Sequence, residues 1–520
     1  MTKLHQFNNL GEYLKENTSR FSDKVAFRCL GESLTYQELD QRSNILASWF
    51  QQQPQLSQGD RVAIQLPNSL AYPIIVYAAF KAGLVIVNTN PMYTPREMKH
   101  QFNDAGVKAL LILDSLTEKL EDILEGSAIQ HIVSINGHDQ LSQLRDKTDA
   151  QLHSFRDLLA NTANPNLQPL DPIAPQDIAI LQYTGGTTGV SKGAALTHDN
   201  LLCNVKQLGE HFDGVLSEGQ EAFVCPLPLY HIYAFTVNLL FVSGIGGCNV
   251  LITNPQNPDE FIDSMSNVKF SAFTGINTLF VGLSQYPPFK ELDFSNLKLT
   301  MSGGTTLTID AATKWGEMTG CTISEGYGLS ETSPVVSFNK PGREEIGTVG
   351  LPLPSTTVEI RDGNNNRVAD GEEGELVIKG PQVMRGYWQR EDENAKVFTE
   401  DGFLKTGDVA VIQPSGAIKI VDRLKDMILV SGFNVYPNEI EGVLTQHSAI
   451  AEAAVIGQPD VKTGEKVCAY VTVTGDISEE EIISHCRDQL TAYKVPKQVN
   501  IVTALPKSSV GKILRKDLRN

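Results

Sequence analysis

Residues 184–193 read Thr-Gly-Gly-Thr-Thr-Gly-Val-Ser-Lys-Gly and follow the apolar run at residues 178–182. A strand that ends in a glycine-rich turn is typical of an α/β sheet, where ligands bind at the carboxyl ends of the strands. Glycines let backbone N–H groups approach phosphate oxygens, hydroxyl groups supply further donors, and Lys192 adds a positive charge. The stretch therefore predicts an α/β fold with a phosphate-binding loop, against the alternative of a plain surface turn. The residues concerned are Thr184, Gly185, Gly186, Thr187, Thr188, Gly189, Ser191, Lys192 and Gly193.

The stretch differs from the phosphate loop of GTPases. In that motif the lysine precedes a serine or threonine, whereas Lys192 precedes Gly193, and the glycine spacing is also different. A simple P-loop GTPase is therefore disfavoured.

Short β-branched runs alternate with amphipathic helix patterns around the loop, which is the rhythm of a layered α/β fold. A first lobe is predicted from residue 34 to about residue 137, and a second from residue 178 to residue 300. Two helices of the first lobe are expected to begin at capping boxes, Thr35 with Glu38 and Thr94 with Glu97. The apolar runs lie at residues 62–66, 84–88 and 109–113, and then at residues 178–182, 249–253, 270–274 and 297–301.

The remaining segments complete the predicted organisation. Residues 136–171 are mostly polar, which indicates a surface connection between the lobes. Residues 349–421 form short alternating runs separated by Gly, Asp and Asn, which predicts a β-rich subdomain. We therefore expect a large N-terminal domain at residues 1–422 and a small, mobile α+β domain at residues 426–520, with a hinge near Lys425.

Length and charge limit the class of protein. A chain of 520 residues with 41% apolar and 20% charged residues is expected to fold into several domains. A formal net charge of −18 disfavours nonspecific nucleic-acid binding. Residues 487–520 nevertheless carry eight lysines and arginines against two aspartates, which predicts a phosphate-bearing ligand or, alternatively, a solvated basic face.

The cysteines and the apolar stretches indicate a cytoplasmic protein. Seven scattered cysteines without a CxxC pair predict reduced thiols and argue against structural zinc. The N-terminus has no signal-peptide pattern, and polar residues or prolines interrupt the apolar stretches at residues 70–87 and 227–246, which predicts buried elements. The adjacent His485 and Cys486 are interpreted as structural because neighbouring residues rarely face each other on a helix or strand.

Four further motifs have a functional and an ordinary interpretation. In residues 325–332, Tyr327 lies between glycines and can pack against a base, while Glu331 can hold Mg²⁺; the alternatives are a core aromatic and a surface acid. The charged cluster at residues 422–426 and the lysine after glycine at residue 512 are also compatible with solvated loops. His231 lies in an apolar, aromatic stretch and is either a carboxylate-orienting group or a core histidine.

Seven motifs, taken in order, resemble the acyl-adenylate-forming superfamily, which includes acyl-CoA synthetases, luciferases and the adenylation domains of peptide synthetases. The resemblance covers nearly the whole chain and is closest to bacterial long-chain fatty-acid:CoA ligases, notably at residues 196–198, 230–231, 273–280 and 428–437. The motifs are residues 183–193, 226–235, 302–307, 326–332, 405–408, 422–426 and 506–515.

The resemblance implies a site for ATP and Mg²⁺. It implies that Tyr327 stacks on adenine, that Asp408 accepts hydrogen bonds from the ribose hydroxyls, and that Glu331 and Thr184 bind the metal. Lys512 would neutralise the charge that grows on the carboxylate and the α-phosphate during attack. The implied catalytic residues are Lys512, His231, Glu331 and Thr184. The other implied nucleotide-binding residues are Gly185, Gly186, Thr187, Thr188, Gly189, Lys192, Gly303, Gly304, Thr305, Glu325, Gly326, Gly328, Ser330, Arg423 and Lys425.

The resemblance also implies an acyl tunnel and a site for coenzyme A. The small domain would swing about Lys425, which would move Lys512 out of the active site and bring a turn of the same domain into it. The thiol could then attack the acyl carbonyl. The implied tunnel residues are His231, Phe235 and Gly275, and the implied turn residues are Ser431, Gly432 and Phe433. Two positions depart from the pattern, since Lys405 replaces an arginine or histidine and Leu429 replaces a lysine of many relatives.

The implied activity is ATP-dependent ligation of a fatty acid, with a long-chain acid favoured, to coenzyme A, which releases AMP and pyrophosphate. Alternatives are a fatty acyl-AMP ligase that delivers the acyl group to a carrier protein, and a nucleotide-binding regulator without chemistry. We expect a monomer or homodimer with fatty acid, ATP and coenzyme A as partners and no nucleic acid. The chain is short before Phe155, where an insertion associated with membrane contact occurs in the group, so only weak peripheral contact with the inner face of the cell membrane is expected.

Overall fold

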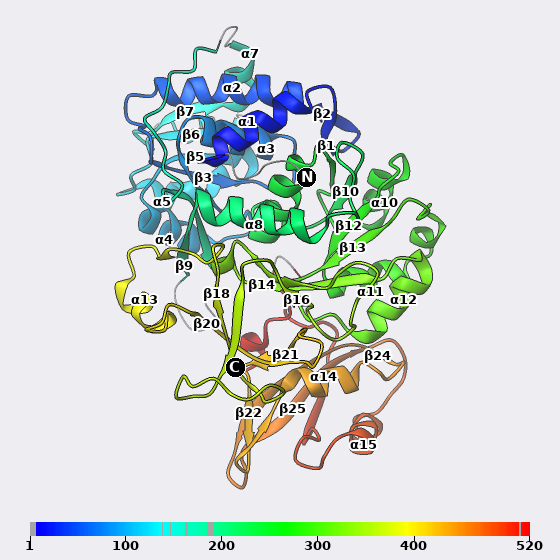
Figure 1. The fold of residues 1–520 in the computed structure, drawn as a ribbon. Helices are drawn as coiled ribbons and strands as arrows, with labels where there is room; N and C mark the ends of the chain where they lie inside the picture. Colours follow the sequence, from blue (N-terminus) through cyan, green and yellow to red (C-terminus); the bar gives the residue numbers. More distant parts are fainter. Residues whose placement is uncertain are drawn as a thin grey trace.

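The computed structural model describes residues 7–137, 139–145, 147–161, 165–184, 191–508 and 511–519. These residues form four β-sheets with helices packed against them (Figure 1). Two large sheets and a four-stranded sheet make up the N-terminal part. A five-stranded sheet with its helices makes up the C-terminal part, drawn orange to red in Figure 1. The predicted α/β fold with two lobes, a β-rich subdomain and a small α+β domain is confirmed.

The first large sheet has eight strands in the order β19-β9-β8-β4-β3-β5-β6-β7. The strands from β8 to β7 are parallel, and β9 and β19 extend the edge in antiparallel pairs. Side chains from its two faces enter separate apolar cores, which explains the nearly continuous apolar runs in the sequence. Its strands are β3 (Arg61–Gln65), β4 (Val85–Asn88), β5 (Val107–Leu113), β6 (His131–Ile135), β7 (Gln151–Ser154), β8 (Ile178–Thr184), β9 (Lys192–Thr197) and β19 (Gly386–Tyr387).

The second large sheet has nine strands in the order β16-β15-β14-β13-β12-β10-β11-β1-β2. The strands from β14 to β1 are parallel, while β2, β15 and β16 pair antiparallel at the two edges. Its strands are β1 (Val25–Cys29), β2 (Glu32–Thr35), β10 (Ala222–Cys225), β11 (Cys248–Leu251), β12 (Ala272–Gly275), β13 (Leu299–Ser302), β14 (Ile323–Gly328), β15 (Val335–Phe338) and β16 (Leu351–Pro352).

The predicted division into consecutive lobes is wrong for strand β8. This strand was expected to open the second lobe, but it pairs with β4 in the first sheet. Strand β1, which precedes the predicted first lobe, pairs with β11 in the second sheet. Apolar periodicity identifies a buried strand without identifying its neighbour, because pairing is decided by long-range packing. The segment expected to be a plain surface connection also contains β7 and helix α7 (Phe155–Asn161), which packs near α2 (Tyr36–Gln52).

The two predicted capping boxes are confirmed. Thr35 caps α2 with Glu38, and Thr94 caps α4 (Pro95–Ala105) with Glu97, each through reciprocal bonds to backbone N–H groups. The other helices of the N-terminal part are α1 (Leu10–Arg20), α3 (Ala71–Lys81), η2 (Asp114–Leu120), α5 (Glu121–Leu124), α6 (Asp139–Ser142), α8 (His198–His211), α9 (Ile232–Ala234), η3 (Phe235–Val242), α10 (Pro258–Ser266), α11 (Asn277–Gln285), η4 (Pro287–Glu291), α12 (Ile309–Thr319), η5 (Ser330–Thr332) and α13 (Glu391–Val397). Among the described helices, none combines the length and apolar character needed to cross a bilayer.

The β-rich subdomain leads directly into the C-terminal part. Its antiparallel strands are β17 (Thr357–Arg361), β18 (Gly374–Lys379), β20 (Leu404–Ile412) and β21 (Ile418–Arg423). Residues 424–427 then connect β21 to a sheet that encloses a core of its own. The C-terminal elements are β22 (Ile428–Val430), β23 (Phe433–Val435), α14 (Pro437–Leu444), β24 (Ile450–Asp460), β25 (Gly464–Val473), α15 (Glu479–Gln489), β26 (Gln498–Ile501) and η6 (Arg515–Leu518).

The pair His485 and Cys486 lies on α15. Cys486 is buried in the C-terminal core, while Nε2 of His485 lies 2.9 Å from the carbonyl oxygen of Val443 on α14. The two side chains thus serve helix packing, in agreement with the structural interpretation.

Candidate active site

A cavity of about 1850 Å³ lies between the large sheets, the β-rich subdomain and the C-terminal domain. Its walls include the carboxyl ends of β8, β13 and β14, which is where α/β sheets bind ligands. The predicted site residues among its lining are Thr184, Lys192, His231, Gly303, Gly304, Thr305, Glu325, Gly326, Tyr327, Gly328, Ser330, Glu331, Asp408, Arg423, Lys425 and Lys512. Five predicted loop residues, Gly185, Gly186, Thr187, Thr188 and Gly189, lie outside the described residues.

The glycines around Tyr327 are explained by close packing. A side chain at Gly326 would place its Cβ 2.2 Å from the ring of Phe338, and one at Gly328 would lie 2.0 Å from the carbonyl oxygen of Pro334. Both contacts arise because β15 returns directly against β14. These two glycines therefore let the strand that carries Tyr327 reach the cavity.

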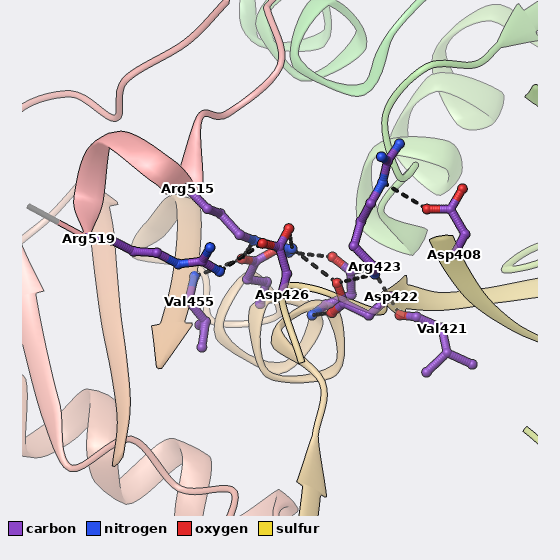
Figure 2. A network of polar contacts seen from close by, with 10 residues as sticks. Asp408, Val421, Asp422, Arg423, Asp426, Val455, Arg515 and Arg519 are labelled. Atoms are coloured by element: carbon purple, nitrogen blue, oxygen red, sulfur yellow. Dashed lines mark hydrogen bonds and ion pairs between the residues drawn. The ribbon is translucent and has the colours of Figure 1, made fainter. Parts of the chain in front are cut away.

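Asp408 is the buried centre of one wall. Its carboxylate accepts a hydrogen bond from the Tyr327 hydroxyl and lies 2.8 Å from Nε of Arg423. Asp408 on β20 and Arg423 on β21 are direct cross-strand neighbours, so the ladder itself holds the pair together (Figure 2). Burial, followed by the charge of Asp408, raises the pKa of the Tyr327 hydroxyl, which keeps that group protonated as a donor. The carboxylate is an acceptor-only group, as a ribose diol would require.

Glu331 and Lys192 are held by two residues that were not predicted from the sequence. The hydroxyl of Tyr387 donates to Oε1 of Glu331 over 2.7 Å. The ammonium of Lys192 lies 2.5 Å from a carboxylate oxygen of Glu393 on α13 and 4.9 Å from the ring centre of Tyr387. No local motif gives a signal for these partners, since Glu393 lies 201 residues from Lys192 along the chain.

His231 and Lys512 come from different domains and share the cavity. The backbone N–H of Tyr233 donates to Nδ1 of His231 over 3.3 Å, which leaves the proton of the neutral ring on Nε2. Burial, with a contribution from the nearby Lys512 ammonium, lowers the pKa of His231 to about 4. At neutral pH the ring is therefore uncharged and can donate a hydrogen bond to a carboxylate.

Lys512 is held in place by contact between the domains. The Cα of Gly511 approaches so closely that a Cβ there would lie 2.8 Å from Ile276 and 3.0 Å from the hydroxyl of Thr278. Lys512 is exposed toward the open cavity, yet loss of hydration and the neighbouring Arg423 guanidinium lower its pKa to about 8.

The charges of the cavity fit a polyanionic ligand. Loss of hydration, followed by the charge of Arg423, also lowers the pKa of Lys425, so these cations repel one another in the same space. An anion among them would relieve that repulsion. The hydroxyl of Thr184 and the carboxylate of Glu331 line the same cavity and are the oxygen ligands that Mg²⁺ prefers.

Glu325 behaves as a neutral group. Its side chain is buried beside the cavity, and Oε1 accepts a hydrogen bond from the Leu307 backbone N–H over 3.0 Å. Burial raises the pKa of this carboxyl to about 8. At neutral pH it therefore offers a hydroxyl donor to the cavity instead of a charge.

Seven predicted residues that the structure describes do not line the cavity: Ser191 and Gly193 of the glycine-rich stretch, Phe235 and Gly275 of the implied tunnel, and Ser431, Gly432 and Phe433 of the implied turn. Phe235 is fully buried in the π-helix η3, and the place of a side chain at Gly275 is filled by the Phe280 ring, 2.7 Å from where a Cβ would lie. An acyl tunnel past these two residues stays a prediction.

Ser431 and Gly432 form the turn between β22 and β23, and Phe433 is the first residue of β23. This hairpin lies at the end of the C-terminal domain that points away from the large sheets (Figure 1). Ser431 and Gly432 have φ angles of 52° and 84°, as a tight two-residue hairpin requires. Phe433 is exposed and stacks on Tyr493 with ring centres 4.7 Å apart. A role for this turn in the cavity would require the domain to move.

Comparison with known proteins agrees with this arrangement. The family model described as AMP-binding enzyme matches residues 14–388, and the one described as AMP-binding enzyme C-terminal domain matches residues 439–512. The long-chain-fatty-acid–CoA ligase of Escherichia coli O6:H1 is 43% identical over 99% of this chain and 95% of its own. The protein of the same name from Bacillus subtilis (strain 168) is 36% identical over 98% of this chain and 94% of its own.

Solved structures are similar in fold. Anthranilate CoA ligase AuaEII, in complex with anthranoyl-AMP, superposes with a TM-score of 0.90 at 24% identity, covering 99% of this chain and 98% of that chain. ATP-bound MatB from Rhodopseudomonas palustris has a TM-score of 0.83 at 28% identity, covering 97% and 98% of the two chains. The matches span both the N-terminal and the C-terminal parts of the molecule. Together with the residues that line the cavity, they show that this chain belongs to the family of AMP-binding enzymes.

Proposed function

We propose that the protein is an ATP-dependent ligase that adenylates a long-chain fatty acid and transfers the acyl group to coenzyme A. The observation that carries the proposal is the meeting of Lys512, from the C-terminal domain, with His231, Glu331 and Asp408 in one cavity. Relatives named long-chain-fatty-acid–CoA ligase, 43% identical over almost the full length, support the same activity.

In the first half-reaction a carboxylate oxygen of the acid attacks the α-phosphorus of ATP, and the bond to the bridging oxygen of pyrophosphate breaks. Asp408 and Arg423 would hold the ribose, and Nε2–H of His231 would orient the acid. Mg²⁺, when bound by Thr184 and Glu331, would compensate the charge of the phosphates together with Lys192. Lys512 would stabilise the charge at the reacting oxygens, which is the largest expected contribution from a positioned cation in a partly dehydrated site.

In the second half-reaction the sulfur of coenzyme A attacks the acyl carbonyl, AMP leaves, and the thiol proton is lost. This step needs the turn at Ser431, Gly432 and Phe433, which does not line the cavity in the present arrangement. We therefore infer that residues 426–520 rotate against residues 1–422 about the hinge at 422–426. The separate core of the C-terminal domain supports rotation as a unit.

The substrate, assembly and location are part of the proposal. The cavity wall near His231 is apolar, with Leu227, Ile232 and Tyr233 among its residues, which favours an acyl chain. We propose a cytoplasmic enzyme, monomeric or homodimeric, that makes at most weak peripheral contact with the membrane to collect its substrate.

The deciding experiment is formation of CoA thioesters from a series of acids between acetate and oleate. The rate is expected to rise with chain length, and Lys512→Ala is expected to retain ATP binding while losing adenylation by at least about a hundredfold. Absence of thioester with free CoA, despite pyrophosphate release, would point to a carrier protein as acceptor. Absence of pyrophosphate release with every acid would reject catalysis altogether.

A further inference from the structure

Arg515 lies at the centre of a buried polar network next to the hinge (Figure 2). Its guanidinium contacts Asp422 at 3.1 Å, Asp426 at 3.5 Å and Glu441 at 2.7 Å, and it donates to the side-chain oxygen of Asn438. The Arg515 side chain is 14% exposed and that of Asp422 is fully buried. Charge-assisted bonds of this kind are stronger than neutral ones and hold their geometry closely.

The contacts of this network fall into two groups relative to Lys425. Asp422 lies on β21 and precedes Lys425 in the chain, whereas Asn438 and Arg515 follow Lys425 in the chain. Three contacts therefore cross the hinge: Arg515 to Asp422, the Asn438 backbone N–H to Asp422 at 2.7 Å, and the Asn438 side-chain amide to the Val421 carbonyl at 3.1 Å. The pairs Arg515 with Glu441 and Arg519 with Asp426 lie on the C-terminal side only. A rotation about Lys425 would break the first group and preserve the second.

The same arginine lies at the end of the loop that carries Lys512, since it begins η6 three residues after Lys512. Two backbone hydrogen bonds join the two sides of this loop, from Leu514 N–H to the Pro506 carbonyl and from Ser508 N–H to the Lys512 carbonyl. Fixing Arg515 against Asp422 thus fixes one end of a short, internally bonded loop. The Lys512 side chain is held toward the cavity as a consequence.

We propose that Asp422 and Arg515 form a latch across the hinge that favours the arrangement with Lys512 in the cavity. The inference rests on the proposed function and deepens it, since Asp422 and Arg515 act as positioning residues that set the balance between the two half-reactions. Opening the latch separates an arginine from one of its three carboxylates and leaves Asp422 without its cationic partner. The latch therefore favours adenylation and has to open before the thiol can attack.

The test measures the two half-reactions separately in full-length Asp422→Asn, Arg515→Gln and the double variant. Adenylation is followed as single-turnover pyrophosphate release with oleate, and acyl transfer as thioester formation from chemically prepared oleoyl-adenylate and CoA. Each single variant is expected to slow adenylation about tenfold while acyl transfer stays unchanged or becomes faster. The double variant should be no slower than the slower single variant, because both changes remove the same contact.

Arg519→Gln is the matched control, since it removes an ion pair with Asp426 that does not cross the hinge. It should leave the ratio of the two rates unchanged, and Arg515→Lys, which keeps the charge, should recover part of the adenylation rate. Trypsin cleavage after Arg423 and Lys425, measured without substrates, should be faster in Asp422→Asn and Arg515→Gln than in the control. This readout needs no activity, so it separates failure of the latch from failure of the proposed function. Equal loss in both half-reactions, or cleavage rates equal to that of the control, would overturn the proposal.

Discussion

At the scale of single residues, the cavity depends on groups whose protonation has been shifted by their surroundings. Lys512 has a pKa lowered to about 8, and Glu325 has one raised to about 8, the first through loss of hydration and nearby cations and the second through burial. Both shifts favour the neutral form of the side chain. As the pH rises through about 8, Lys512 therefore loses its positive charge and Glu325 gains a negative charge.

The pH dependence of adenylation follows from Lys512. Because the role proposed for Lys512 needs the ammonium form, kcat/KM for ATP, which reports the free enzyme, is expected to be constant below pH 8 and to fall about tenfold per pH unit above it. Lys512→Arg, which stays charged, should lose this fall whatever its absolute rate. Glu325→Gln should keep the fall, because this variant removes the other group with a pKa of about 8 and leaves Lys512 in place. A fall that persists in Lys512→Arg would assign the effect to another group.

At the scale of elements, short strand β19 and helix α13 support the side of the cavity where we propose that Mg²⁺ and the phosphates bind. Tyr387 on β19 holds Glu331 with its hydroxyl and carries Lys192 above its ring, while Glu393 on α13 pairs with Lys192. Partners of this kind orient metal ligands, and their removal usually costs ten- to hundredfold in affinity. We therefore expect the contacts at the β19 edge of the first sheet to fix the positions of Glu331 and Lys192.

Tyr387→Phe tests this support, because it removes the hydroxyl and keeps the ring beneath Lys192. The Mg²⁺ concentration for half-maximal pyrophosphate release is expected to rise about tenfold, with a smaller change at saturating Mg²⁺. Glu393→Gln is the companion variant, since it releases Lys192 and leaves the bond between Tyr387 and Glu331 intact. Its Mg²⁺ requirement should equal that of the wild type. The same Mg²⁺ shift in both variants would show that α13 acts only by general stabilisation of this edge.

At the scale of the whole molecule, one cavity is expected to serve two reactions. The C-terminal domain carries the Lys512 loop on one face and the Phe433 hairpin on another, and each face is proposed to act in one reaction. The loop at Lys512 faces the large sheets in the present structure, while the hairpin at Phe433 points away from them (Figure 1). The hairpin carries the exposed side chains of Leu429 and Phe433. Rotation would exchange the two faces at the same site.

Phe433→Ala separates the two orientations. Adenylation should be unchanged, since Phe433 does not line the cavity, whereas kcat/KM for CoA should fall about tenfold through loss of an aromatic contact at the acceptor site. Loss of the stack on Tyr493 is expected to cost about 1 kcal/mol of domain stability, which thermal unfolding would register. Parallel loss of both half-reactions would show that the hairpin matters only for folding.

The sequence by itself determined the local features of this protein. The capping boxes at Thr35 and Thr94, the apolar runs of the parallel strands and the order of the motifs were all readable, because each depends on residues close together in the chain. Family membership and the mixed α/β fold were predicted on that basis and confirmed. Most of the predicted cavity residues that the structure describes do line one cavity.

Only the tertiary structure decided which distant residues meet. It assigned β8 to the first sheet, brought Tyr387 to Glu331 and Glu393 to Lys192, and joined Arg515 to Asp422 across the hinge. It also set the pKa of Lys512, because hydration and neighbouring charge depend on the packing of two domains. Contacts between residues far apart in sequence arise from the burial of whole surfaces, and a local pattern of residue types carries no record of them.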